Sequence, residues 1–551
     1  MNVAEAVGRE LAAHGIDHVF GVVGSGNFHV TNALVAGGAR FIAAAHEGGA
    51  ASMADGYARV SGRICALSVH QGPGLTNALT GITEAAKSRT PLVVLVPEAT
   101  SARSNFFVDV AALAGAIGAG FRRVSAASAV EDAALACRSA RAGAGQTVLL
   151  GMPLDVQSMP AGEPREPRDR STAAGAEAAP PIPDIAPLVD ALCRARRPIF
   201  IAGRGATRPR DASRAALVAL AERSGALLAV SAAARGLFAG DPWYLDVSGG
   251  FATPLCAELV GQADVVVAWG STLNMWTTRH QRLIGPDAFV AQVDLQSSAL
   301  GVNRPIDLGL CGDVAAVAGA CAGELERRGA PPSAWRTPEL RARIAAEGRW
   351  RAVPYDDEGG AGRIDPRTLS IALDDLLPAE RTVVIDSGNF MGYPSMFLSV
   401  PDAAGFCFTQ AYQSIGLGLA SALGAAVARP DRLTVAALGD GGFLMAAAEL
   451  ATAAQLGAPL VVAIYDDAAY GAEVHHFGPH GHPLDTVTFP DRDLAAIARG
   501  FGCAGITVRS PGDLDAARDW LAGPPDRPLV IDAKVSSRHA SWWLEEAFRG
   551  H

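Results

Sequence analysis

The sequence lacks the cysteine pattern of a disulfide-stabilised or zinc-binding protein. Its eight cysteines are scattered over 551 residues without a Cys-x-x-Cys pair, so we expect reduced thiols in the core. It also lacks an apolar run near the roughly 18 residues that span a bilayer. The N-terminus has no signal-peptide pattern. These absences predict a cytoplasmic location and no membrane partner.

Basic clusters are missing as well. The formal net charge is -10, and no block of lysine and arginine interrupts the acidic excess. Proteins that bind nucleic acid neutralise phosphates with clustered positive charge, so we expect no nucleic acid partner. A small anionic substrate is still compatible with this charge, because a single site can be locally positive in an acidic protein.

The length and the pattern of apolar runs predict several α/β domains. A chain of 551 residues is too long for one hydrophobic core. Two stretches rich in proline and charge, 161–184 and 326–361, interrupt the pattern and are expected to be linkers. Elsewhere, short valine- and isoleucine-rich runs end in glycine and precede alanine-rich helical stretches. We therefore expect three doubly wound parallel-sheet domains, at 1–160, 185–325 and 362–551.

The first and third of these blocks resemble each other. Segments that start at Arg63 and Arg432 both read as a strand, a glycine-rich turn, a helix and a second strand beginning Pro-Leu-Val-Val. Convergence of two βαβ units would give the same match. Taken as related domains, they could face each other and hold one ligand at the carboxyl ends of their strands.

An acidic glycine turn in the third block predicts a phosphate and metal site. Asp440 lies in a Gly-Asp-Gly-Gly turn that includes Gly439, Gly441 and Gly442, and Asp467 follows one helix and one strand later. The two turns should lie side by side at the sheet edge. Two carboxylates, one backbone carbonyl and two phosphate oxygens suit octahedral Mg²⁺ or Ca²⁺. The alternative is that Asp440 caps a helix and the second acidic pair only makes a turn.

This pair of turns resembles the diphosphate and metal motif of thiamine diphosphate enzymes. The similarity extends over the whole chain, as pyrimidine-binding, middle and diphosphate-binding domains, and is greatest to acetolactate synthase and the simple 2-oxo acid decarboxylases. The resemblance implies thiamine diphosphate and Mg²⁺ as cofactors. Their implied contacts are the Gly439–Gly442 turn, Gly388, Asn389 and Tyr470 for the cofactor, and Asp440, Asp467 and the carbonyl of Ala469 for the metal.

One position departs from the family pattern. The usual Asn-Asn pair is Asp466-Asp467 here. An additional negative charge should strengthen binding of the metal and repel the diphosphate, so this departure predicts a cost in cofactor affinity.

On the pyrimidine side, Glu47 is expected to begin a helix. A glutamate there is usually a solvent-exposed helix N-terminal charge, but the resemblance implies that it bonds N1′ of the aminopyrimidine and exchanges a proton with it. Ile415 aligns with the bulky residue under the bent cofactor. In this family the two cofactor-binding domains that meet come from different chains, which implies a homodimer or homotetramer.

Several polar residues are candidates for work on the substrate. Ser25 is in a loop expected to face the cofactor, His70 aligns with a histidine of benzoylformate decarboxylase, and Glu473 aligns with an acid of pyruvate decarboxylase. His475 and His476 are expected over the substrate pocket. As single residues these histidines are more often surface groups, and the histidine-rich loop could instead be a weak transition-metal site. Together they predict general acid–base catalysis.

The predicted reaction is decarboxylation of a pyruvate-like 2-oxo acid with transfer of the acyl-anion equivalent to a carbonyl acceptor, as in acetolactate synthase. The alternative is a simple decarboxylase that releases an aldehyde. FAD is doubtful, because the segment that contacts it in the synthases is absent. A dinucleotide-dependent oxidoreductase is a less favoured class, since 201–209 lacks the third glycine of the dinucleotide motif. A non-catalytic relative would be expected to have lost Glu47.

Overall fold

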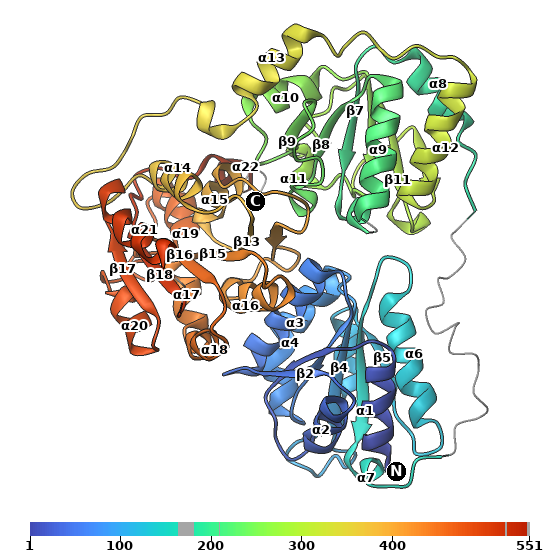
Figure 1. Ribbon diagram of the computed structural model, residues 1–551, viewed down its shortest axis with the longest axis vertical. Helices are drawn as coiled ribbons and strands as arrows, with labels where there is room; N and C mark the ends of the chain where they lie inside the picture. The colour runs from blue at the N-terminus through green and yellow to red at the C-terminus, as the bar shows by residue number, and fades with distance from the viewer. Residues whose placement is uncertain (163–180, 209, 524–525, 548–551) are drawn as a thin grey trace.

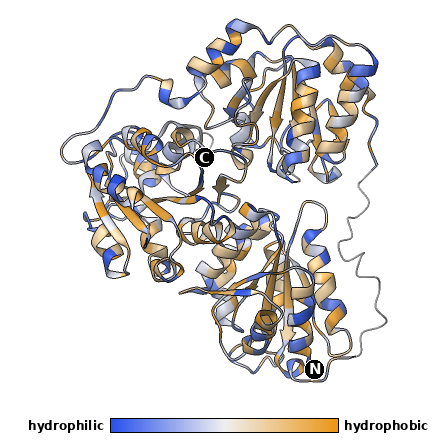
Figure 2. Ribbon diagram, in the orientation of Figure 1, coloured by the Kyte–Doolittle hydropathy of each residue, from blue (hydrophilic) through white to orange (hydrophobic). Residues whose placement is uncertain are grey.

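The computed structural model describes residues 1–162, 181–208, 210–523 and 526–547. It contains three parallel sheets of six strands each, covered by helices on both faces, which confirms the predicted fold class. Figure 1 shows the three units, with the N-terminal unit below, the middle unit above and the C-terminal unit beside both. The hydrophobic strands lie inside each unit and polar helix faces lie outside (Figure 2).

The first unit has the strand order β2-β1-β3-β4-β6-β5. Its strands are β1 (His18–Gly21), β2 (Arg40–Ala43), β3 (Cys65–Ser68), β4 (Leu92–Glu98), β5 (Gly120–Arg123) and β6 (Thr147–Pro153). Its helices are α1 (Val3–Ala13), α2 (Phe28–Ala36), α3 (Glu47–Ser61), α4 (Pro73–Lys87), α5 (Val110–Ala116), α6 (Ala129–Arg141) and α7 (Leu154–Gln157).

The middle unit has the order β12-β11-β10-β7-β8-β9, which is the order of the dinucleotide-binding fold. Its strands are β7 (Pro198–Ala202), β8 (Leu227–Val230), β9 (Tyr244–Val247), β10 (Val265–Trp269), β11 (Phe289–Asp294) and β12 (Leu308–Cys311). Its helices are α8 (Ala186–Arg194), α9 (Arg210–Ser224), α10 (Pro254–Gly261), α11 (Met275–Thr278) and α12 (Val314–Arg327).

The third unit has the order β14-β13-β15-β16-β18-β17. Its strands are β13 (Arg381–Ile385), β14 (Phe406–Phe408), β15 (Leu433–Gly439), β16 (Leu460–Asp466), β17 (Ala504–Val508) and β18 (Leu529–Lys534). Its helices are α14 (Pro366–Leu376), α15 (Gly392–Phe397), α16 (Gly418–Ala428), α17 (Asp440–Ala446), α18 (Glu449–Leu456), α19 (Gly471–Phe477), α20 (Leu494–Gly500), α21 (Asp515–Ala522) and α22 (Trp542–Ala547).

The first and third sheets share one topology. Numbered from the first strand of each unit, both read 2-1-3-4-6-5. The segments starting at Arg63 and Arg432 form equivalent parts of the two sheets, β3-α4-β4 and β15-α17-α18-β16. The weak sequence similarity between the two blocks therefore reflects a shared fold.

Helices α3 and α16 join these two like units. A Cβ added to Gly56 of α3 would lie 2.2 Å from the carbonyl oxygen of Ser421, and one added to Gly424 of α16 would lie 1.9 Å from that of Met53. Such distances are far inside van der Waals contact, so only glycine allows this approach. The two helix backbones therefore touch directly, without side chains between them.

The stretches expected as linkers differ from each other. Most of 161–184 lies outside the described residues. The stretch 326–361 contains α13 (Pro338–Glu347) and a short 3-10 helix at Trp350–Ala352. The Trp350 indole donates a hydrogen bond to the carbonyl of Phe251, which ties this stretch to the middle unit.

Two properties expected from composition can be compared with the fold. Cys193 and Cys311 are exposed, so the expectation that all eight cysteines are core thiols is wrong for these two, which lie at element ends; the other six are buried. Among the described residues, no helix is both long and apolar enough to cross a membrane.

Candidate active site

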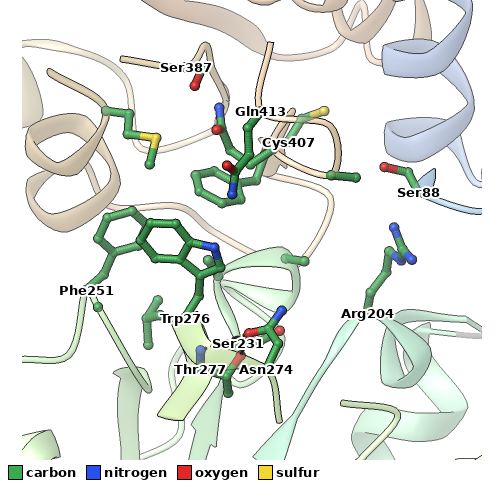
Figure 3. Close-up of a pocket in the computed structure, with 18 of the residues that line it drawn as sticks. Ser88, Arg204, Ser231, Phe251, Asn274, Trp276, Thr277, Ser387, Cys407 and Gln413 are labelled. Carbon is green, nitrogen blue, oxygen red and sulfur yellow. Dashed lines mark hydrogen bonds between the residues drawn. The ribbon is translucent and has the colours of Figure 1, made fainter. Parts of the chain in front are cut away.

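A cavity of about 1500 Å³ lies where the three units meet, and Figure 3 shows part of its wall. Side chains from the middle unit, such as Ser231, Asn274 and Trp276, face Ser387 and Gln413 of the third unit across it. The wall includes the following residues proposed from the sequence: Gly388, Asn389, Ile415, Gly439, Asp440, Gly441, Gly442, Asp467, Ala469, Tyr470 and Glu473.

The two acidic turns lie side by side, as their spacing predicts. Strands β15 and β16 are parallel neighbours with Gly439 opposite Tyr465, so both turns follow the same sheet edge. Helix α17 begins at Asp440 directly after β15, and no side chain caps its N-terminus. The helix-cap alternative for Asp440 is therefore not what the structure shows. The positive end of the helix dipole at this position favours an anion in the cavity.

Glycines in these turns give the backbone a close approach that a side chain would block. A Cβ at Gly441 would lie 2.6 Å from the Tyr470 ring, and a Cβ at Gly471 would lie 2.3 Å from Oδ2 of Asp467. Gly388 has φ +139°, which L-residues rarely adopt. The cavity edge is therefore lined by bare backbone, as a bound diphosphate requires.

Ionising both carboxyls, of Asp440 and of Asp467, is electrostatically unfavourable in the folded chain. Burial and the nearby Asp466 raise the pKa of Asp440 to about 7. Burial and Asp440 raise the pKa of Asp467 to about 8. A divalent cation between them would remove this repulsion. The donor set thus fits Mg²⁺, with the Ala469 carbonyl as the third protein ligand.

The described part of the chain contains no group of three or more His, Cys, Asp or Glu side chains placed to hold a metal. The histidine-rich loop after Tyr470 therefore offers no transition-metal site of that kind within this part. The proposed magnesium site is of a different type, because it uses two carboxylates, a carbonyl and ligand oxygens.

These pKa shifts predict how pH affects the metal-free protein. Both carboxyls hold protons in the folded chain at pH values where the unfolded chain, with a pKa of 3.8, has lost them. Folded-state stability should therefore fall as pH rises from about 4, near the pKa of the unfolded chain, to about 8. Because protons compete with the metal, Mg²⁺ should raise the melting temperature more at pH 8 than at pH 6. Thermal melts with and without Mg²⁺ check both signs; an equal Mg²⁺ effect at the two pH values would contradict them.

Asp386 is a buried residue of the site that the sequence reasoning missed. It follows β13, and its carboxylate accepts hydrogen bonds from the backbone amides of Ser387, Gly416 and Leu417 at 2.9–3.2 Å. Burial nevertheless raises its pKa to about 6. These bonds fix the turn that carries Ile415 against the cavity. The signal was available, since an aspartate ends β13 much as Asp440 follows β15.

The pyrimidine-side candidates lie elsewhere in the same chain. Glu47 begins α3 as expected, accepts a hydrogen bond from Asn77 at 3.1 Å and is partly exposed. Ser25 is exposed, and His70 accepts a hydrogen bond from the Gly26 amide at 3.4 Å. None of Glu47, Ser25 and His70 belongs to the cavity wall. Within one chain, these three residues therefore lie apart from the cavity that the third-unit candidates line.

The backbone just before Glu47 is held by the third unit. The carboxylate of Glu449, on α18, accepts hydrogen bonds from the amides of Ala45 and His46, each at 3.1 Å. Glu449 is buried, with 2% of its surface exposed, and the Thr452 hydroxyl satisfies the same carboxylate. The start of α3 is therefore held by α18, the helix that follows the Asp440 turn and α17.

Helix α19 carries the other proton-transfer candidates. Glu473 is half-buried and lies on the cavity wall. His476, on the same helix, is not part of that wall and packs its ring against Phe477 and His480 at 4.7 and 6.3 Å. Burial, followed by the nearby His539, lowers the pKa of His475. Of these residues, Glu473 is the acid that reaches the cavity.

An aromatic wall closes part of the cavity and was not expected from the sequence. The Trp276 and Trp543 rings lie 5.9 Å apart, and Phe251 lies 6.4 Å from Trp543. The Trp543 indole donates to the carbonyl of Asn389 at 3.0 Å, which connects this wall to the cofactor side. Trp543 lies on α22, close to the C-terminus, where no sequence motif pointed to a site.

Comparison with known proteins distinguishes among the functional classes. Three sequence profiles of thiamine pyrophosphate enzymes match: the N-terminal TPP binding domain at 1–116, the central domain at 185–321 and the C-terminal TPP binding domain at 386–533. A probable 2-ketoarginine decarboxylase of Pseudomonas aeruginosa is 31% identical, over 98% of this chain and 94% of that one. The chain belongs to the thiamine pyrophosphate enzymes. The alternative of a dinucleotide-dependent oxidoreductase is therefore wrong, although the middle sheet has the dinucleotide-binding strand order.

Other relatives of this thiamine pyrophosphate enzyme differ in their reactions. A sulfoacetaldehyde acetyltransferase of Rhodobacter capsulatus is 28% identical over 100% of this chain and 96% of that one. The solved structure of a thiamine diphosphate-dependent 4-hydroxybenzoylformate decarboxylase of Rhodococcus jostii has a TM-score of 0.79, with 21% identity, and the match covers 97% of this chain and 99% of that one. The chain is thus a member of the family of 2-oxo acid decarboxylases and carboligases.

Proposed function

We propose that this enzyme decarboxylates a 2-oxo acid with a bulky side chain and releases an aldehyde. The observation that carries this proposal is Glu473, an acid on the wall of the cavity that Asp440 and Asp467 also line. This ranks simple decarboxylation above the carboligation that the sequence favoured, because an acid on the cavity wall could supply the proton that makes an aldehyde.

Residues of the third unit would hold the cofactor. The amides at the start of α17 and the glycine turn would bind the diphosphate, and the carboxylates of Asp440 and Asp467 would hold Mg²⁺. Ile415, also on the cavity wall, would contact the cofactor. When bound, thiamine diphosphate supplies the carbon nucleophile and accepts the electrons released with CO₂.

The chain's own residues would control protons and water. Glu473 would donate a proton to the carbon that has lost CO₂. Glu47 would hold a proton at N1′ of the aminopyrimidine, which requires a Glu47 that faces the cavity. Since the Glu47 of the same chain does not line it, we propose that a second copy of the chain supplies this residue. The functional unit is then at least a dimer.

The aromatic wall supports a substrate larger than pyruvate. The rings of Trp276, Trp543 and Phe251 line the cavity next to Asn389. Water hydrates such an apolar surface poorly. A bulky apolar or planar side chain on the 2-oxo acid would cover it. Two relatives are named as decarboxylases of 2-ketoarginine and 4-hydroxybenzoylformate, which are acids of this size.

A carboligase is the second candidate. The cavity volume of about 1500 Å³ leaves room for an acceptor beside the first substrate, and one relative is named an acetyltransferase. In that case, a second carbonyl compound would take the acyl-anion equivalent before Glu473 protonates it.

A substrate panel tests the proposal. Pyruvate, benzoylformate, 4-hydroxybenzoylformate and 5-guanidino-2-oxopentanoate are each supplied with thiamine diphosphate and Mg²⁺, and products are identified by NMR. We expect at least about a tenfold higher kcat/KM for one of the bulky acids than for pyruvate, with an aldehyde as the product. A preference for pyruvate with 2-acetolactate as the main product would reverse the ranking in favour of the carboligase.

A further inference from the structure

Lys534 is a buried cation beside the acidic turn, with no assigned role. It is the last residue of β18, and only 2% of its side chain is exposed. Its ammonium lies 2.5 Å from Oδ2 of Asp466, 2.8 Å from Asp491 and 3.1 Å from Asp532. A buried lysine is costly unless it is paired, so these contacts explain how the charge is tolerated.

Asp466 is the partner nearest to the proposed metal site. It lies opposite Lys534 in the register of β16 and β18, and its side chain is 2% exposed. One carboxylate oxygen accepts from Lys534 and the other accepts from the Ala468 amide at 3.0 Å. Arg363 is also close, but it donates to the backbone carbonyls of Asp466 and Val535 and not to the carboxylate.

The other two acids around Lys534 have partners of their own. Asp491 is half-exposed and lies 3.7 Å from Arg509, and Asp532 accepts from the Leu494 amide at 3.0 Å. Among the described residues, Lys534 is the cation that forms an ion pair with the Asp466 carboxylate. Lys534 and Asp466 therefore form a buried ion pair at the ends of two neighbouring strands, and Lys534 also lies close to Asp491 and Asp532.

We propose that Lys534 is the counter-charge that makes Asp466 equivalent to the neutral asparagine usual in this family. The inference rests on the proposed metal site at Asp440 and Asp467. Lys534 offsets the charge of Asp466, so the net charge that the acidic turn presents to the metal approaches that of Asp467 alone. The cost in diphosphate affinity expected from the Asp-Asp pair is thereby reduced.

If Lys534 acts as a counter-charge, its loss should change the affinities for the metal and for thiamine diphosphate in opposite directions, whereas a purely structural role would weaken both. Without Lys534, the uncompensated Asp466 would attract a free divalent cation more strongly and repel thiamine diphosphate. Without the Asp466 charge, Lys534 would keep only Asp491 and Asp532 as anionic neighbours, and its less compensated positive charge would do the reverse. At the separations between adjacent buried side chains, one unit charge changes each affinity by roughly tenfold. Restoring neutrality with both changes should cancel the two effects.

The experiment measures two affinities in the purified full-length protein. Calorimetry gives the Kd of Mn²⁺ alone, as a probe of the metal site, and the Kd of thiamine diphosphate at saturating Mg²⁺. Lys534→Gln should bind Mn²⁺ about tenfold more tightly and thiamine diphosphate about tenfold more weakly. Asp466→Asn should shift both constants in the opposite directions, and the double variant should lie within about threefold of wild type.

Arg381→Gln is the matched control. Arg381 is also a buried cation paired with an aspartate, Asp374, but it begins β13 at the opposite sheet edge. This variant should lower the melting temperature without changing either Kd. If Lys534→Gln does not fold, Asp466→Asn alone decides, because Lys534 keeps Asp491 and Asp532 as partners there.

The counter-charge role of Lys534 would be overturned if both single variants bind both ligands more weakly and the double variant does not recover. Failure of the wild-type protein to bind either ligand would instead overturn the proposed function, so the two failures are distinguishable.

Discussion

Replacing Glu47 with glutamine should reduce kcat by about a hundredfold or more, while thiamine diphosphate stays bound. Glutamine has almost the same shape as glutamate but cannot exchange a proton with N1′ of the aminopyrimidine. Steady-state turnover, together with calorimetric binding of thiamine diphosphate, measures both parts of this result. Glu47 is only partly buried at the start of α3, so the variant should fold, and a melting curve separates a folding defect from lost catalysis.

Glu10→Gln is a suitable control for Glu47→Gln. Glu10 is a carboxylate of the same unit, on α1, and pairs with His14. It should leave kcat unchanged. Wild-type turnover in Glu47→Gln would contradict the proton-exchange role.

Mixing two inactive variants tests the shared site. In a hybrid of Glu47→Gln and Asp440→Asn chains, one site carries both defects and the other carries neither. Random exchange of subunits should therefore restore about a quarter of wild-type activity, because half of the dimers are hybrids with one intact site. No recovery after verified subunit exchange would contradict a site formed by two chains.

Replacing Asp440 with asparagine should weaken Mg²⁺-dependent binding of thiamine diphosphate by about a hundredfold or more. The change removes one of the two carboxylates that face each other across the turn. It should also raise the melting temperature of the metal-free protein at pH 8, because the repulsion that raises the pKa of Asp467 is reduced. Calorimetry at several Mg²⁺ concentrations and thermal melts measure the two effects.

Asp431→Asn is the control for this charge change. Asp431 is an exposed carboxylate of the same unit that pairs with Arg429 just before β15. It should leave the metal titration unchanged. An unaltered Mg²⁺ requirement in Asp440→Asn would remove Asp440 from the set of ligands.

The fold and the third-unit residues of the candidate site could be predicted from the sequence. The reason is that a glycine turn after a parallel strand marks both the end of the strand and a place where the backbone can approach a ligand. The adjacency of Asp440 and Asp467 followed from chain order alone, since β15 and β16 are sequence neighbours that pair directly.

Other parts of the site depend on contacts between distant segments. Trp276 and Trp543 meet only because α22 returns to the middle unit, and no local pattern encodes that return. The partner of Asp466 was equally hidden, because Lys534 comes from β18, after a long excursion of the chain. His476 illustrates the opposite error, since a chemically suitable residue one helical turn from Glu473 lies off the cavity wall.

The direct backbone contact of α3 and α16 couples the first and third units of one chain, because neither helix can shift along the other without a clash. Glu47 begins α3, and Ile415 lies just before α16, so both candidate groups sit at the ends of elements that cannot slide independently. Hydrogen bonds from the amides before Glu47 to Glu449 strengthen the same coupling. Under the proposed dimer, each chain would contribute Glu47 to one site and Ile415 to the other, so a movement at one site would change the geometry of the other.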